Sequence, residues 1–131
     1  MIEVCCAVIE NERAEILATQ RSEFMTLPFK WEFPGGKIET GESPEQALMR
    51  EIGEELGVYI SIVGKLQPVV HRYTNITVKL IPFLCVIKSG KISLKEHLRC
   101  GWYPPQLLRD LDWAEADLPI VEEVISLKTK L

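Results

Sequence analysis

Residues 36–58 read GKIETGESPEQALMREIGEELGV, and this segment decides the fold and the chemistry of the chain. Ser43 is placed to cap the start of a helix, with Pro44 at the first helical position and Gln46 completing a capping box. Gly57 stands where a left-handed residue closes a helix. The segment therefore predicts a loop, a helix between Ser43 and Gly57, and a second loop.

The apolar and acidic residues of this helix fall on different faces. The apolar positions recur every four residues, as in a buried stripe: Leu48, Ile52 and Leu56. Glu51, Glu54 and Glu55 stand at i, i+3 and i+4, which brings neighbouring Cβ atoms to about 5–6 Å. Carboxylates this close repel one another, and a divalent cation that prefers oxygen ligands removes the repulsion. The pattern predicts a Mg²⁺ site that Mn²⁺ can also fill, although an isolated acidic cluster of this kind is more often a solvated face.

The same segment satisfies G-x5-E-x7-R-E-U-x-E-E-x-G-U, where U is aliphatic, at every specified position. It resembles the signature of the Nudix hydrolases, which cleave nucleoside diphosphates linked to another group. The resemblance implies an α/β protein, an α/β/α sandwich with a central mixed sheet and a loop-helix-loop catalytic motif. It also implies conformational roles for Gly36 and Gly57 and a carboxylate-orienting role for Arg50. Glu42 fits either such pairing or the outer part of a metal site.

Metal ligands and catalytic groups follow from the resemblance position by position. The ligands in the family are carboxylates of the signature and a carbonyl of the preceding glycine turn, here Glu51, Glu54, Glu55 and Gly35. A carboxylate from another loop often completes the site, and Glu96 is the candidate, with an ordinary exposed acid as the alternative. We expect Glu51 or Glu96 to take a proton from the attacking water and Glu54 to be essential for catalysis.

Other polar residues are candidates for contacts to substrate. Arg21, at the end of the second predicted strand, and Lys37, just after the glycine turn, are the cations expected to contact phosphate, and each could equally be a surface charge. Asp117 either caps the last predicted helix or accepts a hydrogen bond from the exocyclic amine of a base. His97 stands beside Glu96, and we expect it to be a surface or packing residue.

Residues 31–39 read WEFPGGKIE and resemble the lead-in of MutT-type nucleoside triphosphate pyrophosphohydrolases, most of all the bacterial CTP pyrophosphohydrolases. The resemblance implies Mg²⁺-dependent hydrolysis of a nucleoside triphosphate to monophosphate and pyrophosphate, in cleaning of the nucleotide pool. Antimutator members read oxidised guanine through an asparagine in the last helix, and Val121 is the best match to it here. We therefore expect CTP, dCTP or modified forms such as 5-methyl-dCTP as substrates. The alternatives are an 8-oxo-dGTP antimutator diphosphatase and a non-catalytic Nudix module that senses nucleotides or binds nucleic acid.

Length and composition set wider bounds. The 131 residues suffice for a single domain, residues 1–131, with a substantial core. A net charge of −4 argues against a general nucleic-acid surface and against a stable nucleic-acid partner. The four cysteines lack zinc-like spacing and read as free, space-filling thiols of a reducing compartment. No apolar run is long enough for a membrane span, so we expect a cytoplasmic protein, a monomer or a homodimer.

The remaining pattern is one of short strands and two further helices. We expect strands over residues 2–10, 15–20, 31–33, 58–73, 76–88 and 100–103, with residues 34–36 breaking the third. A short helix should run from Pro104 to about Arg109, and the last helix from about 118 to 129. Five apolar residues of that last helix are expected in the core: Leu118, Val121, Val124, Ile125 and Leu127.

Overall fold

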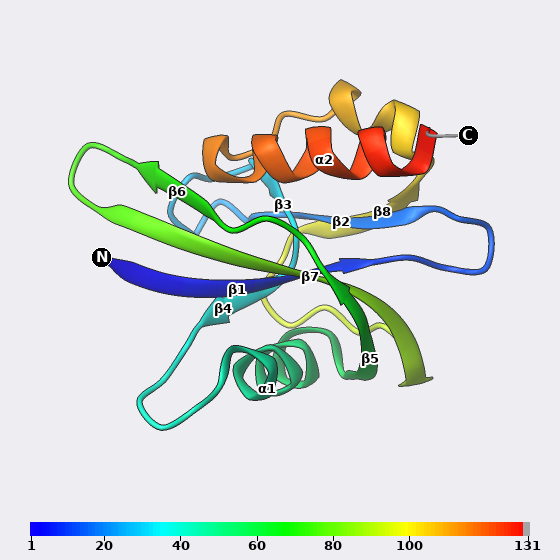
Figure 1. Cartoon of the computed structure of the whole chain (residues 1–131), viewed down its shortest axis with the longest axis horizontal. Helices are drawn as coiled ribbons and strands as arrows, with labels where there is room; N and C mark the ends of the chain where they lie inside the picture. Colours follow the sequence, from blue (N-terminus) through cyan, green and yellow to red (C-terminus); the bar gives the residue numbers. More distant parts are fainter. Residues whose placement is uncertain (130–131) are drawn as a thin grey trace.

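Two β-sheets lie between two α-helices in the computed structural model, which describes residues 1–129 (Figure 1). The helix α1 (Pro44–Leu56) covers one side of the strands and α2 (Leu118–Thr129) covers the other. The larger sheet is mixed, because β1 (Ile2–Ile9) runs parallel to β7 (Thr77–Gly90) whereas its other pairings are antiparallel. The predicted α/β/α sandwich with a central mixed sheet is confirmed.

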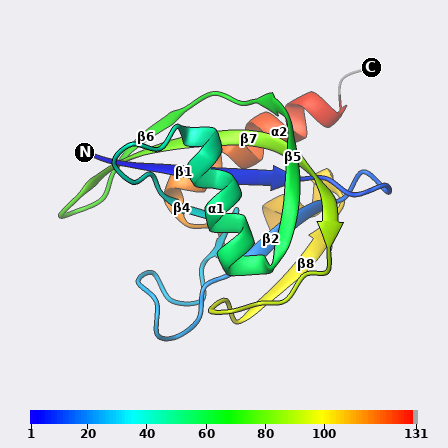
Figure 2. The same ribbon diagram turned by 90° about the horizontal axis from the view of Figure 1, so that it is seen from below.

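The strand order places the acidic helix over the centre of the larger sheet. That sheet has the order β4-β1-β7-β5, with β6 also paired to β7, where β4 is Gly35–Lys37, β5 is Val58–Lys65 and β6 is Val69–Arg72. The smaller sheet has the order β3-β2-β8, formed by Trp31–Glu32, Ile16–Gln20 and Arg99–Tyr103. Figure 2 shows α1 crossing β1 and β4, which it contacts.

The helix α1 has the ends and the buried face that its sequence predicts. The Ser43 side chain accepts a hydrogen bond from the Gln46 amide, and the Gln46 side chain accepts one from the Ser43 amide. Gly57 closes the helix in the left-handed conformation, with φ of 70°. The residues of the predicted apolar stripe are all fully buried: Leu48, Ile52 and Leu56.

The core has one cluster on each side of the larger sheet. Cys5 packs in the cluster under α1 and Cys6 in the cluster under α2, so the two side chains lie on opposite faces as predicted. Burial raises the pKa of the Cys5 thiol to about 11, which keeps it neutral as a packing group. In α2 the buried residues are Ile120, Val121, Val124 and Ile125.

Two expected core residues of α2 are exposed. Leu118 and Leu127 have exposed fractions of 45% and 44%. Both lie at the edges of the buried stripe centred between Val121 and Val124, because successive residues are rotated by about 100° around a helix of 3.6 residues per turn. Their assignment to the core was wrong. None of the helices described within residues 1–129 is long and apolar enough to cross a membrane.

The single strand expected over residues 58–73 is two strands, β5 and β6. Pro68 lies between them, and proline has no amide hydrogen to contribute to a strand pairing. The amide of Gln67 donates instead to the carboxylate of Glu123 on α2. The segment after Pro104 also differs from the predicted α-helix, since Pro105–Asp110 forms a 3-10 helix, η1.

The expected break at residues 34–36 is instead the short strand β4. Gly35 and Gly36 pair with Cys6 and Cys5 of β1. A Cβ atom on Gly35 would lie 2.0 Å from the carbonyl oxygen of Cys5, so only glycine permits this pairing. The two glycines therefore bring the start of the signature segment against the central strand.

Replacing Gly35 with alanine should destabilise the protein by about 1–3 kcal/mol, because the added methyl group meets backbone atoms that cannot move aside. Gly53→Ala is the matched control: Gly53 lies inside α1 with open space around its Cβ position, and alanine there should stabilise by about 0.5–1 kcal/mol. Urea unfolding of the two variants measures both changes. Equal stability of Gly35→Ala and wild type would contradict the close β1–β4 approach.

Candidate active site

Arg50 of α1 joins three parts of the signature segment. Its guanidinium donates to both carboxylate oxygens of Glu42, at 2.7 and 2.9 Å, and to the Lys37 carbonyl at 3.1 Å. It also donates to Glu51 at 2.8 Å. The hydrogen bonds from Arg50 lower the pKa of Glu42 to about 2. Arg50 is thus a cross-link between β4, the loop that holds Glu42, and the helix.

The carboxylates of α1 are oriented in two directions. Glu51 faces Arg50, and so does Glu54, whose carboxylate lies 3.3 Å from the guanidinium and whose side chain is 62% exposed. Glu55 is turned inward and only 21% exposed. Within residues 1–129, no group of three or more acidic, histidine or cysteine side chains is arranged closely enough to hold an ion. Arg50 supplies the positive charge that we expected from a cation.

The surroundings of Glu55 disfavour the charged form of its carboxyl group. Its Oε2 is buried and has no hydrogen-bond partner. Burial raises the pKa of Glu55 to about 8, with a smaller contribution from the charges of Glu51, Glu32 and Glu96. An unpaired buried carboxylate oxygen costs free energy, which a cation would recover. Glu96 is exposed but acts on this same carboxyl group.

The chemical types of the donors present fit a hard divalent cation, while their side chains are turned toward Arg50 and the interior rather than gathered around one point. The donor set of carboxylate and carbonyl oxygens is the one that Mg²⁺ prefers, and the unpartnered Oε2 of Glu55 is one free donor. A Cβ atom on Gly36 would lie 2.3 Å from the Glu51 carboxylate, so the glycine leaves room for that group beside β4. When bound, an ion here would neutralise phosphate charge and acidify a water molecule.

A cleft of two adjoining hollows runs beside this helix. The larger has a volume of about 640 Å³, and both hollows are lined by the same four polar residues: Arg21, Glu32, Lys37 and Asp117. The smaller is also lined by Gly35, Gly36 and Glu55. The fold thus brings all three predicted substrate contacts together with part of the predicted metal site. Glu51, Glu54 and Glu96 do not line either hollow.

Asp117 does not cap α2, which corrects one of its two predicted roles. It ends a 3-10 helix, η2 (Glu115–Asp117), and its buried Oδ2 accepts a hydrogen bond from the Phe33 amide at 2.9 Å. Pro119 follows two residues later and lacks one of the two amide hydrogens that an N-cap side chain can accept. Burial raises the pKa of Asp117 to about 8, against the lowering effect of the Phe33 amide.

Two functional candidates were missed from the sequence, Glu32 and His97. Glu32 accepts a hydrogen bond from Arg21 at 2.7 Å, and its other oxygen lies 2.8 Å from Nε2 of His97. The His97 side chain is 1% exposed, and its Nδ1 lies 3.9 Å from Oε2 of Glu55. His97 is therefore not a surface residue. The available signal was a glutamate between two core aromatics, Trp31 and Phe33, because a charge there needs a partner.

The residue matched to the base-reading asparagine of antimutator members lies in the core. Val121 is 1% exposed, packs in the core under α2 and does not line the cleft. Asp117, four residues earlier, is the polar residue of this region that lines the cleft.

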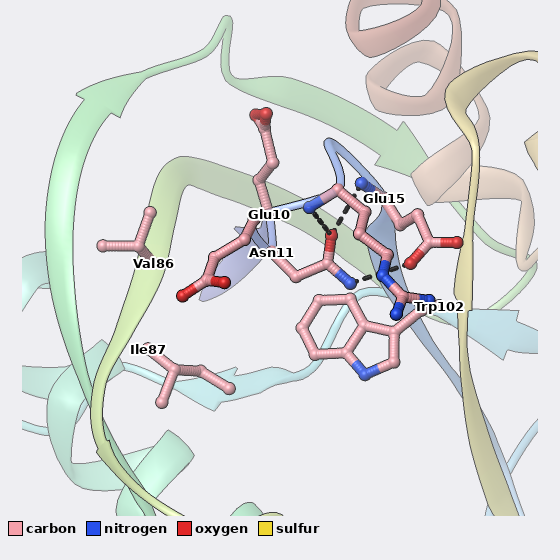
Figure 3. Close-up of a pocket in the computed structure, with 8 residues that line it drawn as sticks. Glu10, Asn11, Glu15, Val86, Ile87 and Trp102 are labelled. Carbon is pink, nitrogen blue, oxygen red and sulfur yellow. Dashed lines mark hydrogen bonds between the residues drawn. The ribbon is translucent and has the colours of Figure 1, made fainter.

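A separate hollow lies near the turn that joins β1 to β2 (Figure 3). The side chain of Asn11 accepts hydrogen bonds from the amides of Arg13 and Glu15 and donates to the Glu15 carboxylate. These bonds close the turn, beside which Trp102, Val86 and Ile87 line the hollow. None of the predicted site residues lines it, whereas Arg21, Lys37 and Asp117 line the cleft.

Comparison with known proteins agrees with this geometry. The family model described as the NUDIX domain matches residues 1–124. The CTP pyrophosphohydrolase of Escherichia coli K12 is 32% identical over 128 residues, covering 98% of this chain and 94% of the relative. The 8-oxo-dGTP diphosphatase of the same organism is 44% identical over 126 residues, covering 94% and 95%.

A solved structure shows the same arrangement in space. The crystal structure of a MutT protein from Methanosarcina mazei Go1 matches with a TM-score of 0.87 and 26% identity, covering 98% of this chain and 96% of that one. The family match spans nearly the whole chain, and the intact signature surrounds the Arg50 cross-link and the cleft. This chain therefore belongs to the Nudix family and is a Nudix hydrolase.

Proposed function

We propose that this enzyme hydrolyses nucleoside triphosphates to the monophosphate and pyrophosphate with Mg²⁺, and that its substrates are CTP, dCTP or modified forms such as 5-methyl-dCTP. Its role would be cleaning of the nucleotide pool. The observation that carries the proposal is the cleft, in which Gly35 and Glu55 line the smaller hollow and Asp117 lines both hollows. A triphosphate spanning the cleft would meet cations and a base-reading acid at once.

Two cationic side chains of the cleft, Lys37 and Arg21, are candidates to contact the phosphates, and their surroundings differ. Lys37 is exposed beside β4 and lines both hollows, and no ion pair among residues 1–129 includes it. Arg21 is held by Glu32 and by the side chain of Thr26. We propose Lys37 as the primary phosphate contact and Arg21 as a fixed charge beside it. Catalysis then rests on positioning and charge neutralisation.

The general base, which takes the proton of the attacking water, would be Glu51 or Glu96. Glu51 lies within the Arg50 cross-link, which fixes its orientation. Glu96 is exposed, free to turn toward a bound substrate, and close enough to influence the titration of Glu55. The presence of all three signature glutamates, Glu51, Glu54 and Glu55, favours an enzyme over a non-catalytic module that senses nucleotides or binds nucleic acid.

The base is proposed to lie in the larger hollow. Its walls are mainly apolar and include Ile2, Val4, Val78, Leu80, Ala114 and Ala116. Asp117 is a buried acid among these apolar residues. The Phe33 amide occupies Oδ2 of Asp117, which leaves Oδ1 for a base edge. The exocyclic amine of cytosine donates to such an oxygen and favours its ionised form, whereas uracil carries a carbonyl oxygen at that position.

A second candidate substrate is 8-oxo-dGTP. The 44% identity to the Escherichia coli 8-oxo-dGTP diphosphatase favours it, since this exceeds the 32% identity to the CTP pyrophosphohydrolase. Guanine also carries an exocyclic amine that could donate to Asp117.

Glu54→Gln should lower kcat by orders of magnitude with the fold intact, because this exposed side chain would ligate the metal and packs against little else. Glu96→Gln should lower kcat by about 10²–10⁴-fold if it is the base. Glu45→Gln, the same change in the first turn of α1, is the control and should keep the wild-type rate. Pyrophosphate release with Mg²⁺ measures all three.

Two outcomes would refute the reaction, and a third would decide between the two candidate bases. Orthophosphate as the sole inorganic product of the wild type, or full activity in EDTA, would refute the reaction itself. A wild-type rate for Glu96→Gln would assign the base to Glu51 and return Glu96 to the ordinary surface.

Asp117→Asn should reduce discrimination between CTP and UTP. The asparagine carbonyl can still accept the Phe33 hydrogen bond, but its amide group then presents a donor to the base. An unpaired donor facing the amine of cytosine costs about 1–3 kcal/mol, so the ratio of kcat/KM values should fall about tenfold or more. An unchanged ratio would remove Asp117 from base reading, and a wild-type preference for 8-oxo-dGTP would establish the second candidate.

Asp117→Asn should also flatten the dependence of stability on pH. The pKa of Asp117 is raised to about 8 in the folded protein, whereas an unfolded aspartate titrates near ~3.9. The folded state therefore binds this proton more tightly, and wild-type stability falls as the pH rises from about 4 to 8 and then levels off. Urea unfolding at pH 5 and pH 8 compares the two proteins. Glu55 leaves some slope in the variant, and identical slopes would contradict the raised pKa of Asp117.

A further inference from the structure

Three side chains from distant segments meet behind the acidic helix: Glu32 of β3, His97 of the loop before β8, and Glu55 of α1. Nε2 of His97 lies 2.8 Å from Glu32, within hydrogen-bond distance. Nδ1 of His97 faces Oε2 of Glu55 at 3.9 Å. Nδ1 of His97 and Oε2 of Glu55 are both buried, and neither atom has a hydrogen-bond partner.

This pair of unpartnered atoms is informative because buried polar atoms nearly always have partners. Nδ1 of His97 faces this Oε2 and can donate to it when it carries a proton, and a shift of about 1 Å would bring the two atoms to hydrogen-bond length. A carboxylate that ligates a metal is commonly held in orientation by a hydrogen bond from a neighbouring group. His97 occupies that place behind Glu55.

The backbone fixes His97 relative to the helix. The amide of Ser93 donates to the Leu56 carbonyl at 2.8 Å, and the amide of Lys95 donates to the Glu55 carbonyl at 3.2 Å. The next residue after His97 is tied to the other sheet, since the amide of Leu98 donates to the Gln20 carbonyl at 2.9 Å. The loop therefore carries the imidazole at a set distance from Glu55.

The far side of the imidazole is fixed as well. Glu32 contacts His97 with one oxygen and accepts from Arg21 with the other, at 2.7 Å. Arg21 in turn donates to the Thr26 hydroxyl at 2.8 Å. Glu32 and Arg21 both line the cleft proposed for the nucleotide. The contacts run from the cleft through Glu32 and His97 to the back of Glu55.

We infer that His97 is a positioning residue that, anchored by Glu32, holds Glu55 in the orientation required to ligate the metal. The inference rests on the metal site in the proposed function. A histidine that merely fills space would need no carboxylate on either side, and neither of its ring nitrogens would have to face one. His97 touches no substrate atom in this role and acts only through Glu55.

The test is Mn²⁺ affinity, measured by electron paramagnetic resonance in the absence of nucleotide. Glutamine in place of His97 can still donate to Glu32 but has no group at the Nδ1 position. His97→Gln should therefore raise the Kd for Mn²⁺ by about 10–100-fold. At saturating Mg²⁺ its kcat should recover toward the wild-type value, because the ligands themselves remain.

His71→Gln is the matched control. His71 is the other histidine of the chain and also contacts a carboxylate, with Nε2 3.1 Å from Glu115, but it does not line the cleft. This variant should keep the wild-type Kd. A wild-type Kd for folded His97→Gln, with or without lost thermal stability, would reduce His97 to a packing residue and overturn the inference.

A second variant covers the case in which His97→Gln does not fold. Glu32→Gln leaves the imidazole in place and removes the charge that anchors it, so it should also raise the Kd for Mn²⁺. An unchanged Kd there would overturn the inference. Failure of the wild type to bind Mn²⁺ is a distinguishable result, because it refutes the proposed metal site itself and the inference with it.

Discussion

The hydrogen bonds of Arg50 are the interaction on which the rest of the site depends. One guanidinium contacts Glu42 in the loop, the Lys37 carbonyl at the end of β4, and Glu51 on the helix. Loss of Arg50 would leave these carboxylates close together without a positive charge. Removing one partner of such a network destabilises a protein by more than the intact network stabilises it. The same charge keeps the acidic face of α1 stable before a metal binds.

From this cross-link the cleft extends toward a second acid. Glu55 and Asp117 both have a pKa of about 8, and in both cases burial is the main cause. Keeping two carboxyl groups in apolar surroundings is unfavourable for stability, and such perturbed acids are concentrated at functional sites. Glu32 lies between them and raises the pKa of each. Metal binding and base recognition would therefore share one electrostatic environment.

Local features were predictable from the sequence, and long-range contacts were not. The capping box and the Leu48 stripe depend on residues within a few positions of each other, and both were predicted correctly. The strand at Gly35 depends on its approach to Cys5, thirty positions earlier, which spacing does not reveal. Pro68 was a readable signal for the split between β5 and β6, since proline interrupts strand pairing.

The same limit explains the site residues. Glu51, Glu54 and Glu55 lie within one helix, so the signature identifies them together. The partner of Asp117 is the Phe33 amide, 84 residues away, and local sequence favoured an N-cap instead. His97 and Glu32 are 65 residues apart, and only the folded chain shows that they meet.

The most direct test of this account is the position of the metal in a crystal grown with Mn²⁺ and a non-hydrolysable nucleoside triphosphate. The account predicts an anomalous peak bounded by the carboxylates of Glu51, Glu54 and Glu55 and the Gly35 carbonyl, with the base beside Asp117. A metal bound instead at the acidic turn near Glu10 and Glu15, with the α1 carboxylates still joined only to Arg50, would contradict it.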